Sequence, residues 1–354
     1  MAKLWEKLIR PVMFGIDAER AHDLGIEALK LGGASLFRQS AEFQGLAINR
    51  FGLSFASPLG VAAGFDKNGV VVDQLASLGF GFVEVGTVTF EPQPGNPKPR
   101  LFRLPADQAL INRLGFNNDG AAVIADRLRK IGRRCVVGVN IGKNKGVPIE
   151  DATDNYLRCF DLIHPVADYI AVNISSPNTP NLRELQQAES LGELIGALQT
   201  RNSELGKKPL LVKIAPDLTE AEIEQAVDVC IRNDVSGIIA TNTTITRDGL
   251  RTANVEEIGA GGLSGKPLTK RSTDVIALIY KYSNGKLPIV GVGGVFTAED
   301  AFDKIVAGAS LIQAYTGFVY GGPTFAGDLN AGLAAIIRES GFANIDEAIG
   351  SKHK

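Results

Sequence analysis

Eight short apolar runs, spaced along most of the chain, constrain the fold more than any other feature of the sequence. Each run is a continuous hydrophobic stretch, the pattern of a strand buried on both faces of a parallel sheet. Segments with helical periodicity lie between them, for example at 68–79, 121–132, 219–233 and 297–309. The predicted strands occupy 59–65, 80–87, 135–141, 169–175, 210–215, 237–242, 288–294 and 310–316.

This alternation predicts an α/β protein, a closed (β/α)8 TIM barrel. The alternative is an open, doubly wound sheet, which usually has fewer strands and a G-x-G-x-x-G fingerprint after the first one. The sequence contains no such fingerprint. The chain has 354 residues, enough for one large barrel or two ordinary domains. We expect residues 41–354 to form the barrel and residues 1–40 to form an N-terminal helical extension.

Composition excludes several classes of function. A net charge of −2 and a pI near 6.0 give no basic field for nucleic acid. Three cysteines without C-x-x-C spacing and three histidines predict no disulfide framework, metal cluster or histidine triad. No apolar run reaches the roughly 18–20 residues of a spanning helix, and the N-terminus lacks a signal-peptide pattern. We therefore expect the protein on the cytoplasmic side of the membrane.

The N-terminal extension has the pattern of two helices. Pro11 should shorten or kink the first helix. Asp17 could cap a second helix that runs through His22 to about Leu31 and stops at Gly32-Gly33. The pattern alone leaves two possibilities open: an arm packed on the barrel or on a second subunit, or an arm on a membrane surface. The first helix has an apolar stripe of Leu4, Trp5, Leu8, Ile9, Val12 and Met13, surrounded by Lys3, Glu6, Lys7 and Arg10.

Two segments depart from the simple repeat. Residues 91–120 form a proline-rich insertion after the second predicted strand, and a loop this long is usually functional. Residues 45–58 alternate like a hairpin that could plug the barrel floor.

Polar side chains collect where the predicted strands end, which is the active-site face of such a barrel. They are neutral amides and hydroxyls, with Lys67 and Lys213 as the only lysines and no histidine. Such a ring suits a planar, polar heterocycle better than a hydrolytic triad. The strand ends carry Asp66, Lys67, Asn68, Thr87, Asn140, Asn173, Ser175, Ser176, Lys213, Thr241, Asn242, Thr243, Gly293, Gly294, Tyr315 and Thr316.

Glycine-rich and proline-rich loops follow three of these strands. Residues 291–317 contain Gly293-Gly294 and a second tight turn at Gly317, and they predict a phosphate cradle, although glycine turns also serve packing. The loop at 261–267 adds a weaker signal of the same kind. Residues 172–183 alternate prolines with amides and predict a rigid lid over the substrate.

The chain resembles the dihydroorotate dehydrogenase family over nearly the whole barrel. The matching motifs, in order, are AAGFDKNG (62–69), EVGTVT (84–89), PKPRLFRLP (97–105), INRLGFNNDG (111–120), VNIGKNK (139–145), VNISSPNTP (172–180), TNTT (241–244), GGLSGKPL (261–268) and GVGGV (291–295). The resemblance implies a flavoprotein oxidoreductase of pyrimidine biosynthesis that oxidises (S)-dihydroorotate to orotate with FMN as cofactor.

The resemblance also implies the binding residues. Those implied for FMN are Ala63, Gly64, Phe65, Asp66, Lys67, Thr87, Asn140, Asn173, Lys213, Thr241, Gly265, Gly294, Tyr315 and Thr316. Those implied for the substrate are Lys67, Asn112, Arg113, Leu114, Gly115, Phe116, Asn173, Asn178, Asn242 and Thr243. Of the two lysines, one near the flavin would favour its anionic reduced form, and one near the substrate would meet its carboxylate.

Ser176 occupies the position where the family places its catalytic base, and the soluble branch has cysteine there. The resemblance implies that Ser176 removes the C5 proton of dihydroorotate while hydride passes from C6 to flavin N5. Serine is a poor base near neutrality, and no histidine is near it in sequence. The family pattern suggests a relay through water near Thr179 and Phe116.

Among the family's branches, only the membrane-associated one has a helical extension before the barrel. The resemblance therefore favours a peripheral membrane protein, bound through residues 1–40, that reduces ubiquinone or menaquinone. His22, Arg103 and Tyr315 match positions near the quinone. The serine and the arm oppose the soluble branch, which uses fumarate or NAD, and the acidic balance opposes the RNA-binding tRNA dihydrouridine synthases. A non-catalytic flavin- or phosphate-binding module stays open, because fold does not fix function.

Overall fold

Eight parallel strands close into a barrel in the computed structural model, which describes residues 5–38 and 43–353. Neighbouring strands follow the chain order, and the last pairs with the first. The predicted barrel is confirmed. The strands are β3 (Leu59–Val61), β4 (Phe82–Val88), β7 (Val136–Ile141), β8 (Tyr169–Asn173), β9 (Leu210–Ile214), β10 (Gly237–Ala240), β12 (Ile289–Val292) and β13 (Leu311–Ala314).

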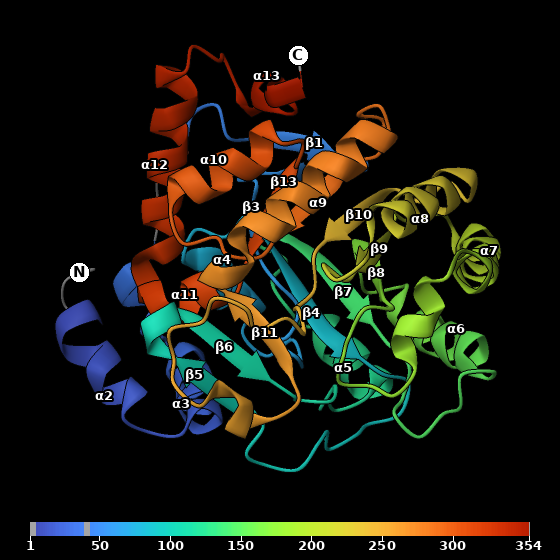
Figure 1. Ribbon diagram of the computed structural model, residues 1–354, viewed down its shortest axis with the longest axis horizontal. Coiled ribbons are helices and arrows are strands. Elements are labelled where there is room, and N and C mark those ends of the chain that lie inside the picture. Colours follow the sequence, from blue (N-terminus) through green and yellow to red (C-terminus); the bar gives the residue numbers. More distant parts are fainter. Residues whose placement is uncertain (1–4, 39–42, 354) are drawn as a thin grey trace.

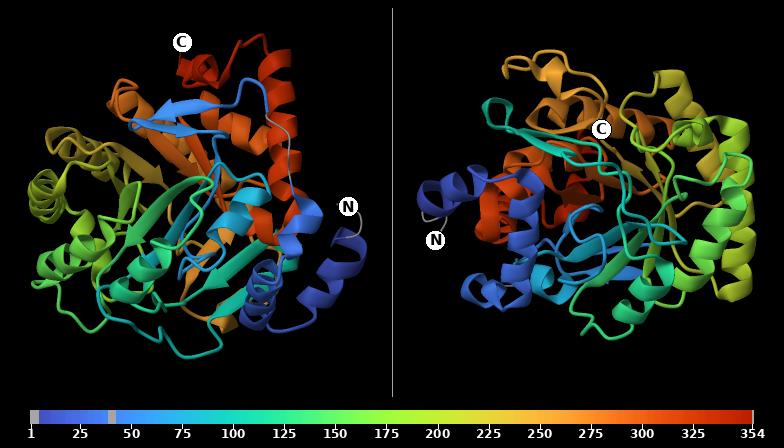
Figure 2. Two further views of the ribbon diagram at one scale, coloured as in Figure 1. Left: turned by 180° about the vertical axis from the view of Figure 1, so that it is seen from behind. Right: turned by 90° about the horizontal axis from the view of Figure 1, so that it is seen from below.

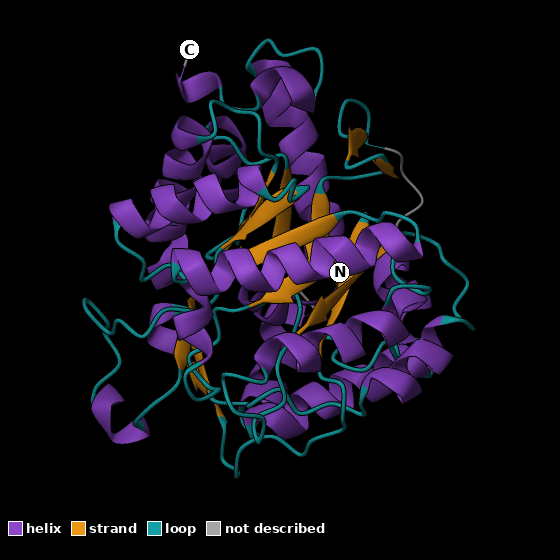
Figure 3. Ribbon diagram, turned by 90° about the vertical axis from the view of Figure 1, so that its right-hand side faces the viewer, coloured by secondary structure: helices purple, strands orange, loops and turns teal. Residues whose placement is uncertain are grey.

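Helices surround the strands, as Figure 3 shows. Two of them begin with capping boxes, Thr219 with Glu222 and Thr297 with Asp300, which satisfy free N–H groups at the helix start. The helices are α4 (Val72–Ser77), α5 (Ala121–Leu128), α6 (Ala152–Ile163), α7 (Ala188–Leu205), α8 (Glu220–Arg232), α9 (Thr269–Tyr282), α10 (Ala298–Val306), α11 (Thr316–Gly321), α12 (Phe325–Glu339) and α13 (Ile345–Ala348). The short 3-10 segments in and around the barrel are η3 (Pro105–Asp107), η4 (Leu182–Gln186), η5 (Val255–Ile258), η6 (Lys266–Leu268), η7 (Gly322–Thr324) and η8 (Ser351–His353).

A hairpin of β1 (Ile48–Arg50) and β2 (Leu53–Phe55) covers the floor of the barrel. The ring of Phe55 meets that of Phe82 edge-on at 5.4 Å, and Phe82 begins β4. The Phe51 ring packs against Gly237, the first residue of β10. A Cβ at Gly237 would lie 2.9 Å from this ring. Both contacts are at the amino ends of strands, so the predicted floor hairpin is confirmed.

The insertion at 91–120 is not one long loop, and that expectation was wrong in part. Its middle forms β5 (Leu101–Leu104) and β6 (Ala109–Asn112), which join β11 (Gly262–Gly265) in a three-stranded antiparallel sheet. The sheet has its own small core, which includes Leu104, Ile111 and Leu263. It lies at the end of the barrel opposite β1 (Figure 1), over the carboxyl ends of the strands.

The N-terminal arm consists of the π-helical turn η1 (Trp5–Ile9), α2 (Arg10–Phe14), α3 (Ala18–Lys30) and the 3-10 turn η2 (Gly33–Phe37). Pro11 stands in the first turn of α2, where the missing N–H costs little, and the helix type changes there. Asp17 Oδ1 accepts from the N–H of Arg20 at 2.9 Å, and α3 ends before Gly32, whose φ is +91°. The expected second helix is confirmed. Leu4 of the predicted stripe and Lys3 beside it lie outside the described residues.

The arm packs against the barrel beside its C-terminal helices. Trp5 Nε1 donates to the carbonyl of Tyr320 at 2.9 Å, and the Phe14 and Tyr320 rings meet edge-on at 5.1 Å. Both views of Figure 2 show the blue arm beside the red C-terminal segment. In the described part of the chain, no helix is long and apolar enough to cross a membrane.

Candidate functional site

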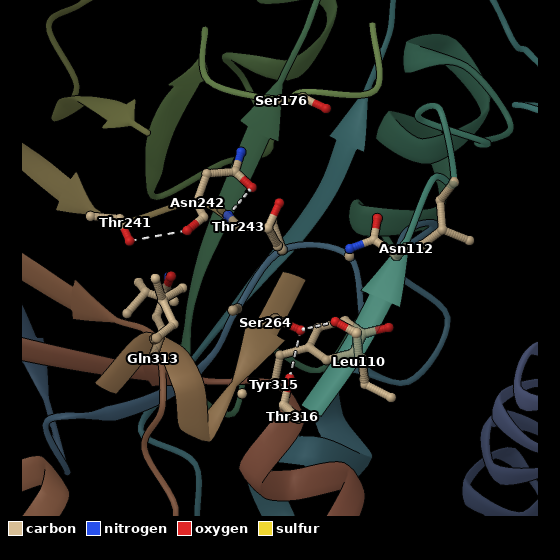
Figure 4. A pocket seen from close by; sticks show the side chains of 18 of the residues that line it. Leu110, Asn112, Ser176, Thr241, Asn242, Thr243, Ser264, Gln313, Tyr315 and Thr316 are labelled. Atoms are coloured by element: carbon tan, nitrogen blue, oxygen red, sulfur yellow. Dashed lines mark hydrogen bonds between the residues drawn. The ribbon is translucent and has the colours of Figure 1, made fainter. Parts of the chain in front are cut away.

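A cavity of about 140 Å³ lies at the carboxyl ends of the barrel strands, under the three-stranded sheet. Figure 4 shows Asn112, Ser176, Asn242 and Thr243 at one end of it and Ser264, Gln313, Tyr315 and Thr316 at the other. The structure thus brings together side chains from most of the barrel strands. The expected site residues that line the cavity are Ala63, Gly64, Lys67, Thr87, Asn112, Leu114, Gly115, Phe116, Asn173, Ser176, Asn178, Lys213, Thr241, Asn242, Thr243, Gly265, Gly294, Tyr315 and Thr316.

Four of the residues expected to bind FMN or the substrate lie outside this lining. Asp66 is buried and accepts from the N–H groups of Val70 and Val71, so it holds the turn after β3, and burial raises its pKa. Arg113 reaches away to the carbonyls of residues 258 and 260. Phe65 faces the arm, and Asn140 lies beneath the lining.

The two strand-end lysines both face the cavity. Lys213 is 5% exposed, and its Nζ is 3.8 Å from the carboxylate of Glu84. Burial lowers the pKa of Lys213, and Glu84 acts in the opposite direction. Burial likewise lowers the pKa of Lys67 to about 8, although Glu19 partly offsets this. The cavity therefore offers one deeply buried cation and a second that titrates within reach of neutrality.

Glycines form one wall of the cavity. Gly294 has φ +70°, and a Cβ there would lie 2.0 Å from Thr269 Oγ1. Gly265 has φ +104°, and its Cβ would lie 2.4 Å from the carbonyl of Gln108. Ser264 Oγ and Thr316 Oγ1, 2.9 Å apart, join this wall to the start of α11 (Figure 4). Only glycine allows such close approach of backbone segments, as a phosphate cradle requires.

The loop after β8 is tied down over the cavity. Ser176 is 5% exposed, and its Oγ accepts from the N–H of Asn178 at 3.2 Å. Asn178 Nδ2 donates to the carbonyl of Asn112 at 3.1 Å, which links this loop to β6. Arg183 Nε donates to the carbonyl of Ser175 at 3.1 Å. Thr179 Oγ1 is buried and has no hydrogen-bond partner within residues 5–38 and 43–353.

Two polar residues at the base of the site were missed from the sequence. Glu84 and Gln313 are both fully buried, and Gln313 Nε2 donates to Glu84 Oε2 at 2.7 Å. Each stands in the middle of an otherwise apolar strand run, FVEVG and LIQA. A single polar residue inside an apolar strand run is the sequence signal for such a position. The pattern of polar strand ends does not include such positions and therefore missed both.

A second, larger cavity of about 350 Å³ lies between the arm and the barrel, and its lining is mostly apolar. His22, Arg103 and Tyr315 all line it. Leu101, Leu110 and Tyr315 also line the first cavity, so these three side chains separate the two spaces.

The polar groups of the second cavity are few. Arg103 Nη1 donates to the carbonyl of Phe14 at 2.9 Å, whereas its Nη2 is buried without a partner in the described residues. The half-buried His22 meets the Phe65 ring edge-on at 5.1 Å. Burial and the Lys67 ammonium lower the pKa of His22 to about 3, so its imidazole is neutral at physiological pH.

No cluster of three metal-binding side chains occurs in the described ranges of the chain. The site instead combines polar strand ends, two lysines and a glycine wall, with an apolar cavity next to it. The fold and the site together define a barrel oxidoreductase that binds a flavin.

Comparison with known proteins identifies the family. Residues 45–337 match the family model described as dihydroorotate dehydrogenase. A dihydroorotate dehydrogenase (quinone) of Gloeobacter violaceus is 51% identical, with 97% of this chain and 98% of the relative covered. One from Anaeromyxobacter dehalogenans is 49% identical, with 99% and 98% covered. The chain therefore belongs to the dihydroorotate dehydrogenase family, whose members are flavin-dependent.

Solved structures agree with this assignment. The crystal structure of DHODH from Eimeria tenella in complex with ferulenol superposes with a TM-score of 0.90 at 40% identity, covering 95% of this chain and 96% of that one. A ligand-free structure from the same organism gives the same TM-score and identity and covers 96% and 100%.

Proposed function

We propose that this protein is a quinone-dependent dihydroorotate dehydrogenase that oxidises (S)-dihydroorotate to orotate. The observation that carries the proposal is the pair of cavities, one polar and one apolar, with Tyr315 in the wall between them. The first suits a polar pyrimidine and a flavin, and the second suits an apolar electron acceptor. Full-length similarity to relatives named dihydroorotate dehydrogenase (quinone) supports the same reading.

The first cavity fits FMN. Lys213 offers an ammonium group at its base, and Gln313 Oε1 is a buried acceptor without a partner in the part of the chain that the structure describes. Gly265 and Gly294 form the wall that suits a phosphate, and Thr87, Thr241 and Thr316 add hydroxyls. When bound, FMN supplies a two-electron acceptor that dihydroorotate reduces and a quinone reoxidises.

Apart from Arg113, the residues we assign to the substrate line the same cavity, and Asn112, Asn242 and Thr243 lie at the end away from Thr316 (Figure 4). Lys67 would bind the carboxylate of dihydroorotate by a charge-assisted hydrogen bond. Asn173 and Asn242 are joined through Asn242 Nδ2 to Asn173 Oδ1 at 3.2 Å, which fixes both amides beside the ring. The loop Asn112–Phe116 and Asn178 would close over it, because Asn178 already bonds to Asn112.

Ser176 is the residue we assign to proton removal from C5. The hydroxyl faces the cavity, and its neighbour Thr179 has a buried hydroxyl without a partner in the described ranges. That free hydroxyl supports a relay of the proton through water toward Thr179, and Phe116 lines the same cavity as Ser176.

The second cavity suits the quinone. The unpaired Nη2 of Arg103 would donate to a quinone carbonyl, and the neutral ring of His22 would do so or pack against the headgroup. Ile9 and Leu24 line the cavity and are also 36% and 49% exposed, so they stand at its mouth. An isoprenoid tail would enter there.

The arm carries an apolar outer surface that suits a membrane, as a peripheral arm on the cytoplasmic side would need. Leu8, Val12 and Leu31 are 62%, 70% and 87% exposed, and Lys7, Arg10 and Lys30 lie close to them in sequence. The arm thus packs on the barrel with one face and exposes apolar and basic side chains to solvent on the other. Its exposed large apolar side chains are Leu8, Ile9, Val12, Ile16, Leu24, Leu31 and Leu36.

Anaerobic addition of dihydroorotate to the FMN-loaded protein tests the proposal. We expect the flavin band near about 450 nm to bleach, and decylubiquinone to restore it much faster than fumarate. Faster reoxidation by fumarate would identify the soluble branch instead. A band that persists after dihydroorotate is added would leave only a non-catalytic flavin-binding module.

A further inference from the structure

The carboxylate of Glu84 lies fully buried inside the barrel, below the cavity we assign to FMN. Four groups surround it: Asn140 Nδ2 at 2.9 Å, Gln313 Nε2 at 2.7 Å, the Tyr169 hydroxyl at 3.0 Å and Lys213 Nζ at 3.8 Å. Burying a carboxylate lowers the stability of the folded state unless the carboxylate is paired and hydrogen-bonded. Here it is saturated with donors, in a strand where an apolar residue would otherwise fit.

A carboxylate only accepts hydrogen bonds, so it fixes the direction of every bond around it. Asn140 must turn its Nδ2 toward Glu84, which leaves its Oδ1 to accept from the Thr87 hydroxyl at 2.6 Å. The Thr87 oxygen then accepts from Asn173 Nδ2 at 3.0 Å. Asn173 Oδ1 is left to accept from Asn242 at 3.2 Å. One buried anion thus sets the orientation of amides up to the cavity.

The same constraint fixes the orientation of the Gln313 amide. Its Nε2 donates to Glu84, so its Oε1 must point elsewhere. That oxygen is buried and finds no partner in the described residues, although Gln313 lines the cavity. A buried acceptor left unpaired costs about 1–3 kcal/mol. An N–H group of a ligand would remove this cost, and the isoalloxazine ring carries such a group.

We propose that Gln313 contacts the flavin as a hydrogen-bond acceptor and that Glu84 is a positioning residue that orients Gln313 and Asn140 beneath it. The inference rests on the proposed FMN site. It adds two residues of β4 and β13 to that site and explains why a carboxylate stands in an apolar strand.

Titration of the apoprotein with FMN, followed by flavin fluorescence quenching, tests the proposal. We expect Gln313→Leu to weaken FMN binding roughly tenfold, the effect of one lost buried hydrogen bond. Glu84→Gln should weaken binding to a similar extent, because its amide N–H would face one of the present donors and turn Gln313 or Asn140 away. The absorption band of bound FMN should also change shape in both variants.

A double-mutant cycle separates orientation from general damage. If Glu84 acts through Gln313, the double variant should bind FMN within about threefold of the weaker single variant. Tyr169→Phe is the matched control, since its hydroxyl also donates to Glu84 but Tyr169 does not line the cavity. It should lower the unfolding midpoint of the apoprotein and leave FMN affinity within about twofold of wild type.

Wild-type affinity in Gln313→Leu would overturn the flavin contact, and effects that multiply in the double variant would overturn the orientation of Gln313 by Glu84. If Glu84→Gln does not fold, Glu84→Asp serves in the same cycle, because it keeps the charge but withdraws the carboxylate from Gln313. A wild-type protein that binds no FMN would refute the proposed function itself, which distinguishes the two failures.

Discussion

The Ser176 hydroxyl accepts a hydrogen bond from the amide N–H of Asn178, and within the described residues it makes no hydrogen bond to a basic side chain. Its proton must therefore leave as the C5 proton arrives, through the route we assign to Thr179. We expect Ser176→Ala to slow flavin reduction by dihydroorotate at least about a hundredfold, the usual scale of general-base catalysis. FMN affinity should not change. Stopped-flow absorbance measures the rate, and an undiminished rate would remove Ser176 from the mechanism.

Lys67 should make substrate binding depend on pH. Its pKa is lowered to about 8 by burial, and only the ammonium form pairs with the substrate carboxylate. As pH rises through 8 the ammonium is lost, so the KM for dihydroorotate should increase, measured with a dye acceptor between about pH 7 and pH 10. Lys67→Met should have a high KM that is flat over this range. A wild-type KM that falls with increasing pH would contradict the assignment.

At this scale, the rule that barrel chemistry lies at strand ends found most of the cavity lining in advance. Lys67, Ser176 and Lys213 converge as expected. The rule could not find Glu84 or Gln313, because their side chains enter the cavity region from the strand interior. Nor does sequence adjacency decide which way a side chain points.

An ion pair joins the arm to the loop beside the residues that we assign to the substrate. Arg100 Nη2 is 2.7 Å from Glu19 of α3, and both side chains are nearly buried. Arg100 Nη1 also donates to the carbonyls of Pro94 and Asn96, and Asn96 Nδ2 bonds to the carbonyl of Arg113. Burial alone would raise the pKa of Glu19, but Arg100 and Lys98 together outweigh it and the pKa is lowered.

Glu19→Gln should therefore weaken both folding and substrate binding. A guanidinium left buried without its carboxylate costs about 3–5 kcal/mol, so the free energy of unfolding in urea should fall by that order. The KM for dihydroorotate should rise as the loop at 94–96 loosens. Glu27→Gln is the matched control on the same helix, since its exposed pair with Lys30 contributes under about 1 kcal/mol. Equal losses in both variants would exclude a special role for Glu19.

The outer face of α2 should determine membrane affinity. Val12 is 70% exposed, and a carboxylate there would oppose burial in the headgroup region. We expect Val12→Glu to reduce co-sedimentation with phosphatidylcholine–phosphatidylglycerol vesicles and to leave dihydroorotate oxidation with a dye acceptor unchanged. Val123→Glu on α5, at a site 49% exposed, is the control and should bind vesicles like the wild type. Reduced vesicle binding in both variants would indicate a charge effect without a specific face.

Among the elements, helices and barrel strands could be predicted because their periodicity is local. The predicted carboxyl ends of the elements were less accurate. The helix predicted to reach residue 132 stops at Leu128, and the first barrel strand, predicted to reach residue 65, stops at Val61. The β5–β6 hairpin could not be predicted, because its third strand, β11, comes about 150 residues later. Its stability depends on the contact with Leu263, which no local pattern reveals.

For the whole molecule, we expect FMN to be part of the stability of the fold. A ligand at about a hundred times its Kd stabilises the folded state by about 2.7 kcal/mol, so removal of FMN should lower the thermal unfolding midpoint. Riboflavin, which lacks the phosphate, should restore less of the midpoint at the same concentration, because it does not use the glycine wall. Equal recovery with both compounds would contradict the phosphate assignment to Gly265 and Gly294.

The side chains of Leu101, Leu110 and Tyr315 separate the two cavities, so the oxidant and the reductant that we assign to them would stay apart. Steady-state kinetics should then follow a ping-pong scheme, with parallel double-reciprocal lines when both substrates are varied. An inhibitor bound in the apolar cavity under the arm would compete with the quinone and not with dihydroorotate. The two specificities can also diverge independently: substitutions of Leu24 or Leu29, which are α3 residues that line only the apolar cavity, would exchange one acceptor for another while the pyrimidine cavity stays unchanged.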